Sequence, residues 1–380
     1  MKAVFLLTSI VLLFGACDLN LPSKAPATGM EVVPDTLNYA VVIPSPDTLY
    51  NKILGSLVGS AIGDAMGAPT EMWSRQDRQR SYGYVEALDP SFIDPSPEGL
   101  WDFHLPSGTT TDDTRWKKLV GNYVIDHLQD FYGPKGASPF KFADLILDSY
   151  QQEVKNLKQL KADNPVDIEY RVRRLNWLQE WAMVAEPFVE KDLEAYTTAL
   201  HRFYGGELLC AGMLYAPALG LAYPADPLKA YQTAYRLGIF DQGYARDITG
   251  LTAALTAAAM SPNATKASVM EVFRTVDPHN YFRSRLFGRE AFRTYRTAEH
   301  IAQSARETSA CQDGQPRYLW KEDSLQSCQL QTAFELLDDQ NQHAPAHAQE
   351  ILLVTITSIL FSDFDFQKCM EFIVNYGRDN

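Results

Sequence analysis

Helical spacing of the hydrophobic positions dominates the sequence from about residue 47 onward. The run Ser45-Pro46-Asp47-Thr48 offers an N-cap, and apolar residues then follow at helical spacing: Leu49, Ile53, Leu57, Ala61 and Ala65. Further amphipathic segments are predicted at about residues 115–131, 139–160, 168–186, 207–222, 227–238, 245–260, 265–275, 286–305, 329–338, 347–361 and 365–375. Turn residues separate these segments, and no pair of alternating runs indicates a sheet. The pattern predicts one compact, multi-helix, all-α domain over residues 47–380.

Glycines recur every four residues in the first predicted helix, at positions 55, 59, 63 and 67, and so lie near one face of it. Each glycine in a helix interior costs about 1 kcal/mol relative to alanine. Very close approach of another helix or of a ligand would compensate for that cost. A membrane-dimer interpretation fails, because Lys52 and Asp64 leave too short an apolar stretch to span a bilayer.

The N-terminal residues have the features of an export signal. Lys2 precedes a mostly apolar run from Ala3 to Ala16, which is too short to cross a bilayer. Small residues directly before Cys17 resemble a bacterial lipobox, in which Cys17 is acylated and becomes the first mature residue. We therefore predict a signal peptide at 1–16 and a proline-rich tether at 17–46. The alternative is an ordinary secretory signal cleaved nearby, which also places the protein in the cell envelope, periplasmic or at the cell surface.

Charge and composition narrow the choice of partners. The 380 residues are 46% apolar and 21% charged, as expected of a globular chain. The net charge is −13, from 34 basic and 47 acidic residues, which argues against a nucleic-acid partner. Beyond Cys17, four cysteines remain, and Cys311 and Cys328 flank a polar segment that a disulfide could close. Cys210 and Cys369 lie in apolar helical stretches and are interpreted as buried thiols.

The run Thr111-Asp112-Asp113-Thr114 is the first candidate for chemistry. Two adjacent carboxylates flanked by hydroxyls repel each other unless a positive charge lies nearby. Mg²⁺ and Mn²⁺ prefer oxygen ligands of this kind. Taken alone, however, the run is more typical of a helix N-cap with acidic residues in the first turn.

Two further motifs change that interpretation. Gly63-Asp64-Ala65-Met66-Gly67-Ala68-Pro69-Thr70-Glu71 follows the glycine-spaced helix, and Val374-Asn375-Tyr376-Gly377-Arg378-Asp379-Asn380 ends the sequence. Together with Thr111–Thr114, and in this order, they resemble the motifs of the ADP-ribosylglycohydrolase family. A looser similarity extends over most of residues 47–380.

The resemblance implies an all-α domain with a binuclear Mg²⁺ centre, or sometimes Mn²⁺. It assigns metal ligation to Thr111, Asp112, Asp113 and Asp379. It further implies catalytic roles for Glu71 and Asp113, with substrate binding near Gly67 and Gly108, while Asp64 would tie the glycine helix to the metal loop by hydrogen bonds. Family members continue the last motif with an aspartate and a threonine, so the domain is expected to be incomplete at its C-terminus.

The leading hypothesis is a lipid-anchored, metal-dependent hydrolase that cleaves an ADP-ribosyl or related ribosyl or glycosyl linkage with a metal-activated water. A small molecule or an ADP-ribosyl or glycosyl conjugate would be its substrate. The alternative is a non-catalytic helical surface lipoprotein that binds a glycan or nucleotide, and a third possibility is a fragment of a longer enzyme. His347 and Glu350, which share a helical face, are interpreted as capping and packing residues.

Overall fold

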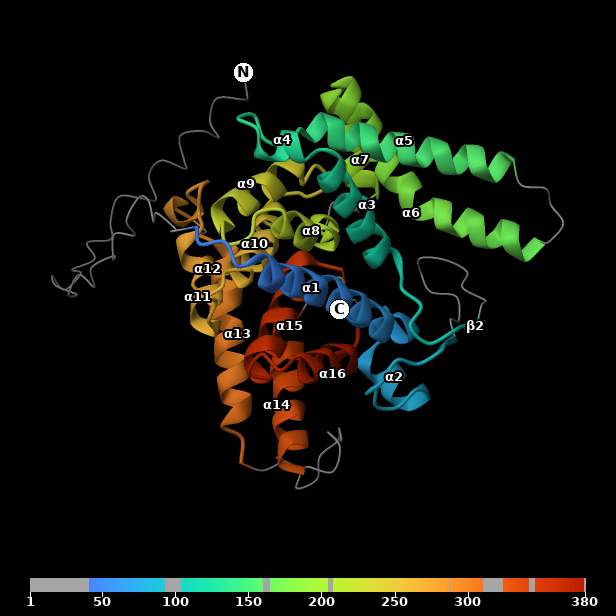
Figure 1. The fold of residues 1–380 in the computed structure, drawn as a ribbon. Coiled ribbons are helices and arrows are strands. Elements are labelled where there is room, and N and C mark those ends of the chain that lie inside the picture. The colour runs from blue at the N-terminus through green and yellow to red at the C-terminus, as the bar shows by residue number, and fades with distance from the viewer. Residues whose placement is uncertain are drawn as a thin grey trace, which may run out of the picture. The chain divides into compact units, whose positions relative to one another are not determined.

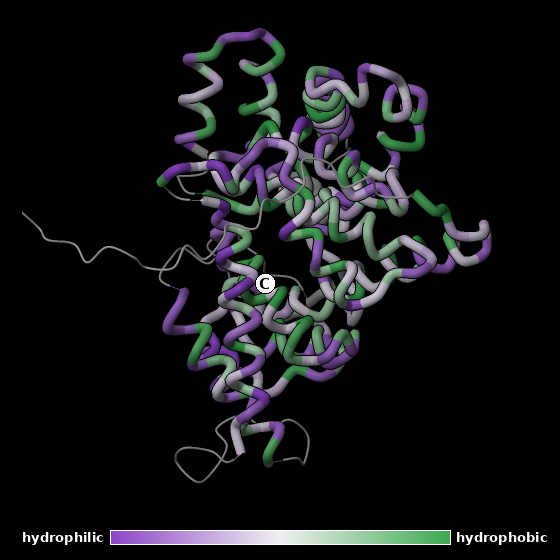
Figure 2. Tube along the Cα trace, turned by 90° about the vertical axis from the view of Figure 1, so that its left-hand side faces the viewer, coloured by the Kyte–Doolittle hydropathy of each residue, from purple (hydrophilic) through white to green (hydrophobic). Residues whose placement is uncertain are grey.

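The structure is a computed structural model that describes residues 41–92, 104–159, 165–203, 208–286, 288–309, 324–341 and 346–378. The predicted signal peptide, Cys17 and most of the tether lie outside these ranges, and so does Asp379. Hydrophilic and hydrophobic residues alternate along the helices in Figure 2. Among the helices described, none is both long enough and apolar enough to cross a membrane.

Helices make up most of the described chain (Figure 1). The first half contains α1 (Pro46–Gly67), α2 (Arg75–Ser81), α3 (Asp112–Asp126), α4 (Leu128–Tyr132), α5 (Pro139–Lys158), α6 (Pro165–Glu190), α7 (Leu193–Phe203) and α8 (Ala216–Leu221). The second half contains α9 (Pro227–Leu237), α10 (Tyr244–Ala259), α11 (Lys266–Met270), α12 (Val272–Thr275), α13 (Glu290–Arg306), α14 (Ser324–Gln340), α15 (Ala348–Phe361) and α16 (Phe366–Tyr376). The predicted all-α class is confirmed.

Short elements complete the fold. The 3₁₀ helices are η1 (Ala68–Thr70), η2 (Ala211–Leu214) and η3 (Tyr281–Arg283), and the strands β1 (Ser91–Phe92) and β2 (His104–Leu105) form an antiparallel pair. The sequence did not predict this pair, because two-residue strands are too short to show an alternating pattern. The predicted helix at 207–222 is instead divided into η2 and α8.

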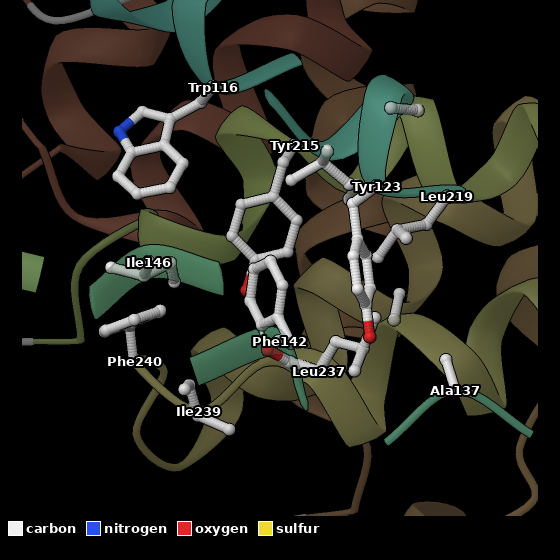
Figure 3. Close-up of a cluster of buried hydrophobic side chains, with 14 of the residues drawn as sticks. Trp116, Tyr123, Ala137, Phe142, Ile146, Tyr215, Leu219, Leu237, Ile239 and Phe240 are labelled. Carbon is white, nitrogen blue, oxygen red and sulfur yellow. Dashed lines mark hydrogen bonds between the residues drawn. The ribbon is translucent and has the colours of Figure 1, made fainter. Parts of the chain in front are cut away.

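Helix α10 forms the centre of the packing, because its faces contribute to two hydrophobic clusters. Ala253 and Ala257 belong to the first cluster, and Ile248 and Leu251 to the second. The first cluster is rich in aromatic residues, and Figure 3 shows part of it, including Trp116, Tyr123, Phe142, Tyr215 and Phe240. Small side chains on α10 let its neighbours α8 and α9 approach closely.

A buried ion pair joins α10 to the start of α13. The guanidinium of Arg289 donates to both carboxylate oxygens of Asp247, at 2.7 and 3.0 Å, and both side chains are fully buried. The hydroxyl of Tyr231 on α9 donates to the same carboxylate at 2.5 Å. Arg289 also donates to the carbonyls of Phe273 and Val276, so this charged group is buried with its hydrogen bonds satisfied.

The glycine face of α1 packs against α16. A Cβ atom at Gly63 would lie 2.9 Å from the Met370 sulfur, and one at Gly59 would lie 3.2 Å from the Phe366 ring. At Gly55, by contrast, a Cβ would meet nothing within 4 Å. A helix, rather than a ligand, therefore accounts for two of the four glycines.

Three of the predicted disulfide and thiol cysteines lie in the described residues: Cys210, Cys328 and Cys369. Cys328 on α14 is disulfide-bonded, while Cys311, its predicted partner, lies outside the described residues. Cys369 on α16 is a buried thiol, as expected, whereas Cys210, also predicted to be buried in a helix, is a half-buried thiol just before η2. Burial raises the pKa of the Cys369 thiol to about 11, which keeps it protonated and unreactive.

The glycine packing predicts opposite effects at two positions of α1. Replacing Gly63 with leucine should lower the free energy of unfolding by roughly 1–3 kcal/mol, since the new side chain collides with Met370. Replacing Gly55 with alanine should raise it by about 0.5–1 kcal/mol, because the site is open and alanine favours the helix. Urea unfolding measures both, and a Gly63→Leu protein as stable as wild type would contradict this packing.

Asp241, in the loop before α10, is a buried carboxyl. Its Oδ1 accepts a hydrogen bond from the Gly212 amide at 2.8 Å, and only 6% of the residue is exposed. Burial raises the pKa of Asp241 to about 6, although the Gly212 hydrogen bond and the charge of Arg246 act in the opposite direction. The folded state therefore holds this proton more tightly than the unfolded chain does.

Asp241 should consequently make stability depend on pH. Because its pKa is raised in the folded state, its contribution is fully present below about pH 4 and is lost as the pH rises through about 6. Relative to Asp241→Asn, the wild type should lose on the order of 3 kcal/mol across that interval. Chemical unfolding at several pH values measures the difference, with Asp339→Asn on the exposed surface as the control. Parallel profiles for wild type and Asp241→Asn would contradict the assignment.

Candidate functional site

Asp64, near the end of α1, binds the start of α3 directly. Its Oδ1 accepts the Thr111 amide at 2.9 Å, and its Oδ2 accepts the Thr114 amide at 3.0 Å and the Thr114 hydroxyl at 2.5 Å. Figure 1 shows α1 and α3 meeting there, although they lie far apart in the sequence. The expectation that Asp64 ties the glycine helix to the acidic loop is confirmed.

Thr111 is the N-cap of α3, and Asp112 and Asp113 form the first turn of the helix. The Thr111 hydroxyl accepts the Asp113 amide at 3.3 Å, so the N-cap interpretation holds for the backbone. The two carboxylates lie at the positive end of the helix dipole, which favours their ionised forms. This cap bond uses the Thr111 hydroxyl and not the two carboxylates, so the cap and a metal site are compatible.

The pKa of Asp113 reflects both its burial and the acidic residues around it. Burial raises the pKa of Asp113 to about 6, the negative charges of Asp112 and Asp64 raise it further, and Lys117 and Arg115 oppose the rise. Arg115 forms an ion pair with Asp112 at 3.9 Å. A divalent cation would relieve this repulsion more fully than a surface arginine, and the all-oxygen donor set suits Mg²⁺ or Mn²⁺.

The described residues supply only part of such a centre. Within the ranges that the structure describes, no group of three or more His, Cys, Asp or Glu side chains is arranged to hold a metal ion. The hydroxyl and carboxylate oxygens of Thr111, Asp112 and Asp113 are donors of the kind that a hard cation prefers. Asp379, the predicted ligand from the last motif, lies outside the described ranges. The metal and its ligands therefore stay predictions.

Glu71 lies in a tight turn that follows η1. The Trp73 amide donates to the Thr70 carbonyl at 3.1 Å, and the dihedral angles of Glu71 (φ −53°, ψ 138°) and Met72 (φ 62°) match a type II turn. Position i+2 of this turn normally requires glycine, but Met72 occupies it. The turn places Glu71 seven residues beyond Asp64, next to the end of α1.

The last motif reaches the same turn through its backbone. The Met72 amide donates to the Arg378 carbonyl at 3.0 Å, and the Arg378 amide donates to the Trp73 carbonyl at 2.7 Å. The structure thus brings together the first and last of the three motifs, just as Asp64 brings together the first and second. All three predicted segments therefore meet around the C-terminal end of α1.

The two predicted substrate-binding glycines flank these contacts. Gly67 is the last residue of α1, three residues after Asp64. Gly108 lies in the loop before α3, three residues before Thr111, with a φ of +84° that favours glycine. Gly108 is exposed, and a Cβ there would meet nothing within 4 Å. Their contact with a substrate stays a prediction.

Asn375 on α16 is an important residue that the sequence did not single out. Its side chain accepts from Arg78 Nη1 at 2.8 Å and from the Val85 amide at 2.9 Å, and donates to the carbonyls of Val85 and Glu371, each at 2.7 Å. Asn375 and Arg78 are each only 1% exposed. A polar residue inside the apolar stripe of α16 was the available signal. These bonds fasten α2 and the following loop to the helix that leads into the last motif.

Glu350 on α15 is buried, as its packing interpretation required, and it pairs with Arg378. Only 1% of Glu350 is exposed, and Arg378 Nη2 donates to its Oε2 at 3.0 Å while Nε donates to Oε1. Burial raises the pKa of Glu350 above its ordinary value, although the hydrogen bond and the charge of Arg378 act in the opposite direction. His347 is also buried, but its side chain makes no capping hydrogen bond to α15.

A polar cavity of about 240 Å³ lies next to Glu350, among residues of α13, α14 and α15. Glu290, Thr294, Asn341 and Glu350 help to line it. Asn341 Nδ2 also donates to the hydroxyl of Tyr376, within the last motif, at 2.7 Å. The cavity walls are therefore linked to the last motif through both Asn341 and Glu350.

Comparison with known proteins agrees with this arrangement. The family model for ADP-ribosylglycohydrolase matches residues 45–380, which is nearly the whole chain. The chain therefore belongs to the ADP-ribosylglycohydrolase family. The uncharacterized protein YegU of Escherichia coli (strain K12) is 29% identical over 75 residues, which cover 20% of this chain and 21% of that protein. The chain thus aligns with about a fifth of the length of that relative.

The contacts of Asp64 predict a stability effect that is confined to one end of α1. Replacing Asp64 with alanine removes the acceptor of three hydrogen bonds and should cost about 2–3 kcal/mol of unfolding free energy. The Thr111 and Thr114 amides should then exchange with solvent hydrogen faster. The control is Asp47→Ala at the exposed start of the same helix, which should cost less than about 1 kcal/mol. Equal losses in the two variants would refute the role given to Asp64.

Proposed function

We propose that this chain is a metal-dependent hydrolase that cleaves an ADP-ribosyl or related ribosyl or glycosyl linkage. The observation that supports it most is the set of hydrogen bonds that Asp64 accepts from Thr111 and Thr114, which fixes two adjacent carboxylates at the start of α3. Burial is the main cause of the raised pKa of Asp113, and the negative charge of Asp112 adds to it, so a cation bound here would stabilise both carboxylates. Family membership agrees with a glycohydrolase built on these motifs.

Thr111, Asp112 and Asp113 would hold Mg²⁺ or Mn²⁺ together with Asp379, and the family resemblance implies two ions. When bound, the metal supplies a more acidic water and an electrophilic contact for substrate hydroxyls. Asp64 accepts hydrogen bonds from Thr111 and Thr114 with both carboxylate oxygens. We therefore assign it the role of holding the proposed ligands Thr111, Asp112 and Asp113 in place.

The carboxylates also suit the charge that develops in the reaction. Breaking a ribosyl C–N or C–O bond passes through a state resembling an oxocarbenium ion, whose positive charge is stabilised by nearby carboxylates. Asp113, to which the family resemblance implies a catalytic role, would accept a proton from the attacking water. Glu71 lies in the turn next to the end of α1, where it can assist that transfer or close over the substrate.

The protein would act in the cell envelope, attached to a membrane through a lipid on Cys17 and a tether at 17–46. The sequence features of the N-terminus support this part of the proposal. An exported position indicates a small-molecule substrate or an ADP-ribosyl or glycosyl conjugate outside the cytoplasm. Labelling of expressing cells with a radioactive fatty acid tests the anchor, since Cys17→Ser should abolish incorporation.

The hydrolase proposal predicts that activity depends on both carboxylates and on the metal. Asp112→Ala and Asp113→Ala should each lower kcat/KM by at least about 100-fold, because each removes a proposed metal ligand. EDTA should abolish activity, and Mg²⁺ or Mn²⁺ should restore it, while circular dichroism shows an unchanged helical content. Release of ADP-ribose from N-linked and O-linked ADP-ribosyl peptides is the measurement.

A different outcome would favour the alternative function. Binding of ADP-ribose or of a glycan that survives both substitutions and EDTA unchanged, without turnover, would contradict the hydrolase proposal. The protein would then be a helical lipoprotein that binds its ligand without cleaving it.

A further inference from the structure

Two adjoining turns at the candidate site hold strained backbone. Met72 has a φ of 62°, and Gly377 and Arg378 have φ values of 83° and 69°. Only glycine adopts this left-handed region without steric cost, so Met72 and Arg378 are both strained. Strain of this kind persists only where surrounding contacts impose it.

Backbone contacts join the two turns to each other. The hydrogen bonds between Met72 and Arg378 and between Arg378 and Trp73 form a reciprocal pair at 3.0 and 2.7 Å. Gly377 packs so tightly against the first turn that a Cβ would lie 3.1 Å from the Trp73 carbonyl oxygen. A shift of residue 378 would therefore move the turn that contains Glu71 as well as the chain that leads into Asp379.

The buried side chain of Glu350, which lies outside the two turns, contacts them through Arg378. Glu350 belongs to α15, contacts neither turn through its backbone, and is 1% exposed. Both of its carboxylate oxygens accept from the Arg378 guanidinium. Because a buried carboxylate requires its cation, the pair holds the Arg378 side chain in one position and with it the left-handed backbone.

We propose that Glu350 is a positioning residue, which acts through Arg378 to fix the paired turns that contain Glu71 and lead into Asp379. This inference rests on the proposed function, because it gives Glu350 a role in orienting the acidic residues of the metal centre. Glu350 is not among the residues predicted to bind the metal or the substrate. Groups that orient metal ligands typically change metal affinity when they are altered, even though they do not bind the metal.

Calorimetric titration of the full chain with Mn²⁺ tests the inference without any substrate. Glu350→Gln should weaken Mn²⁺ binding by about 10-fold or more, and Arg378→Lys, which keeps the charge but loses the paired hydrogen bonds, should weaken it less. The Met72 amide should also exchange faster in Glu350→Gln, because its acceptor is the Arg378 carbonyl. Arg378→Lys preserves the test if Glu350→Gln does not fold.

The matched control is Asp130→Asn. Asp130 on α4 pairs with Lys141 of α5, with 2.7 Å between Oδ2 and Nζ, and belongs to elements other than those that hold the paired turns. This variant should bind Mn²⁺ as wild type does, so that loss of an ion pair alone is separated from loss of positioning.

The outcomes distinguish this inference from the proposed function. Wild-type binding that Asp112→Ala abolishes, while Glu350→Gln and Arg378→Lys leave it unchanged, would overturn the role of Glu350 and retain the metal centre. Equal weakening by Asp130→Asn and Glu350→Gln would reduce Glu350 to a general structural residue. A wild-type protein that binds no Mn²⁺ would overturn both proposals.

Discussion

Three hydrogen bonds accepted by the carboxylate of Asp64 connect the end of α1 to the start of α3. They satisfy two of the backbone amides that a helix N-terminus leaves without partners, and they use a charged acceptor at the positive end of the helix dipole. The orientation of Asp112 and Asp113 depends on them, because those residues form the turn that Asp64 holds. Without this constraint the two carboxylates would be free to separate and relieve their repulsion.

The other end of the site depends on how closely α16 approaches α1. Gly59 and Gly63 leave room for Phe366 and Met370, so α16 packs directly on the glycine face and its C-terminal end reaches the turn after η1. Asn375 fixes the same helix to α2, and Glu350 holds Arg378. Three segments that are distant in the sequence are thereby joined through helix packing and a few buried polar bonds rather than through one continuous element.

The sequence predicted much of this arrangement, for identifiable reasons. The all-α class followed from the helical spacing of apolar residues, and the role of Asp64 followed from the order of the motifs. Helix α2 was missed because its residues are almost all charged or polar and its one buried side chain is Arg78. The pairing of Glu350 with Arg378 joins residues 28 positions apart through tertiary contact, which no local pattern reveals. The left-handed turn at Met72 was equally hidden, since methionine is rare in that conformation.

The most direct test is a crystal structure of the protein grown with Mn²⁺, with data collected at a wavelength where manganese scatters anomalously. We predict an anomalous difference peak within ligand distance of the carboxylates of Asp112 and Asp113, with Asp64 still bonded to Thr111 and Thr114. Ordered carboxylates without such a peak, at a Mn²⁺ concentration that saturates binding sites of ordinary affinity, would contradict the interpretation of this acidic cluster as a metal centre.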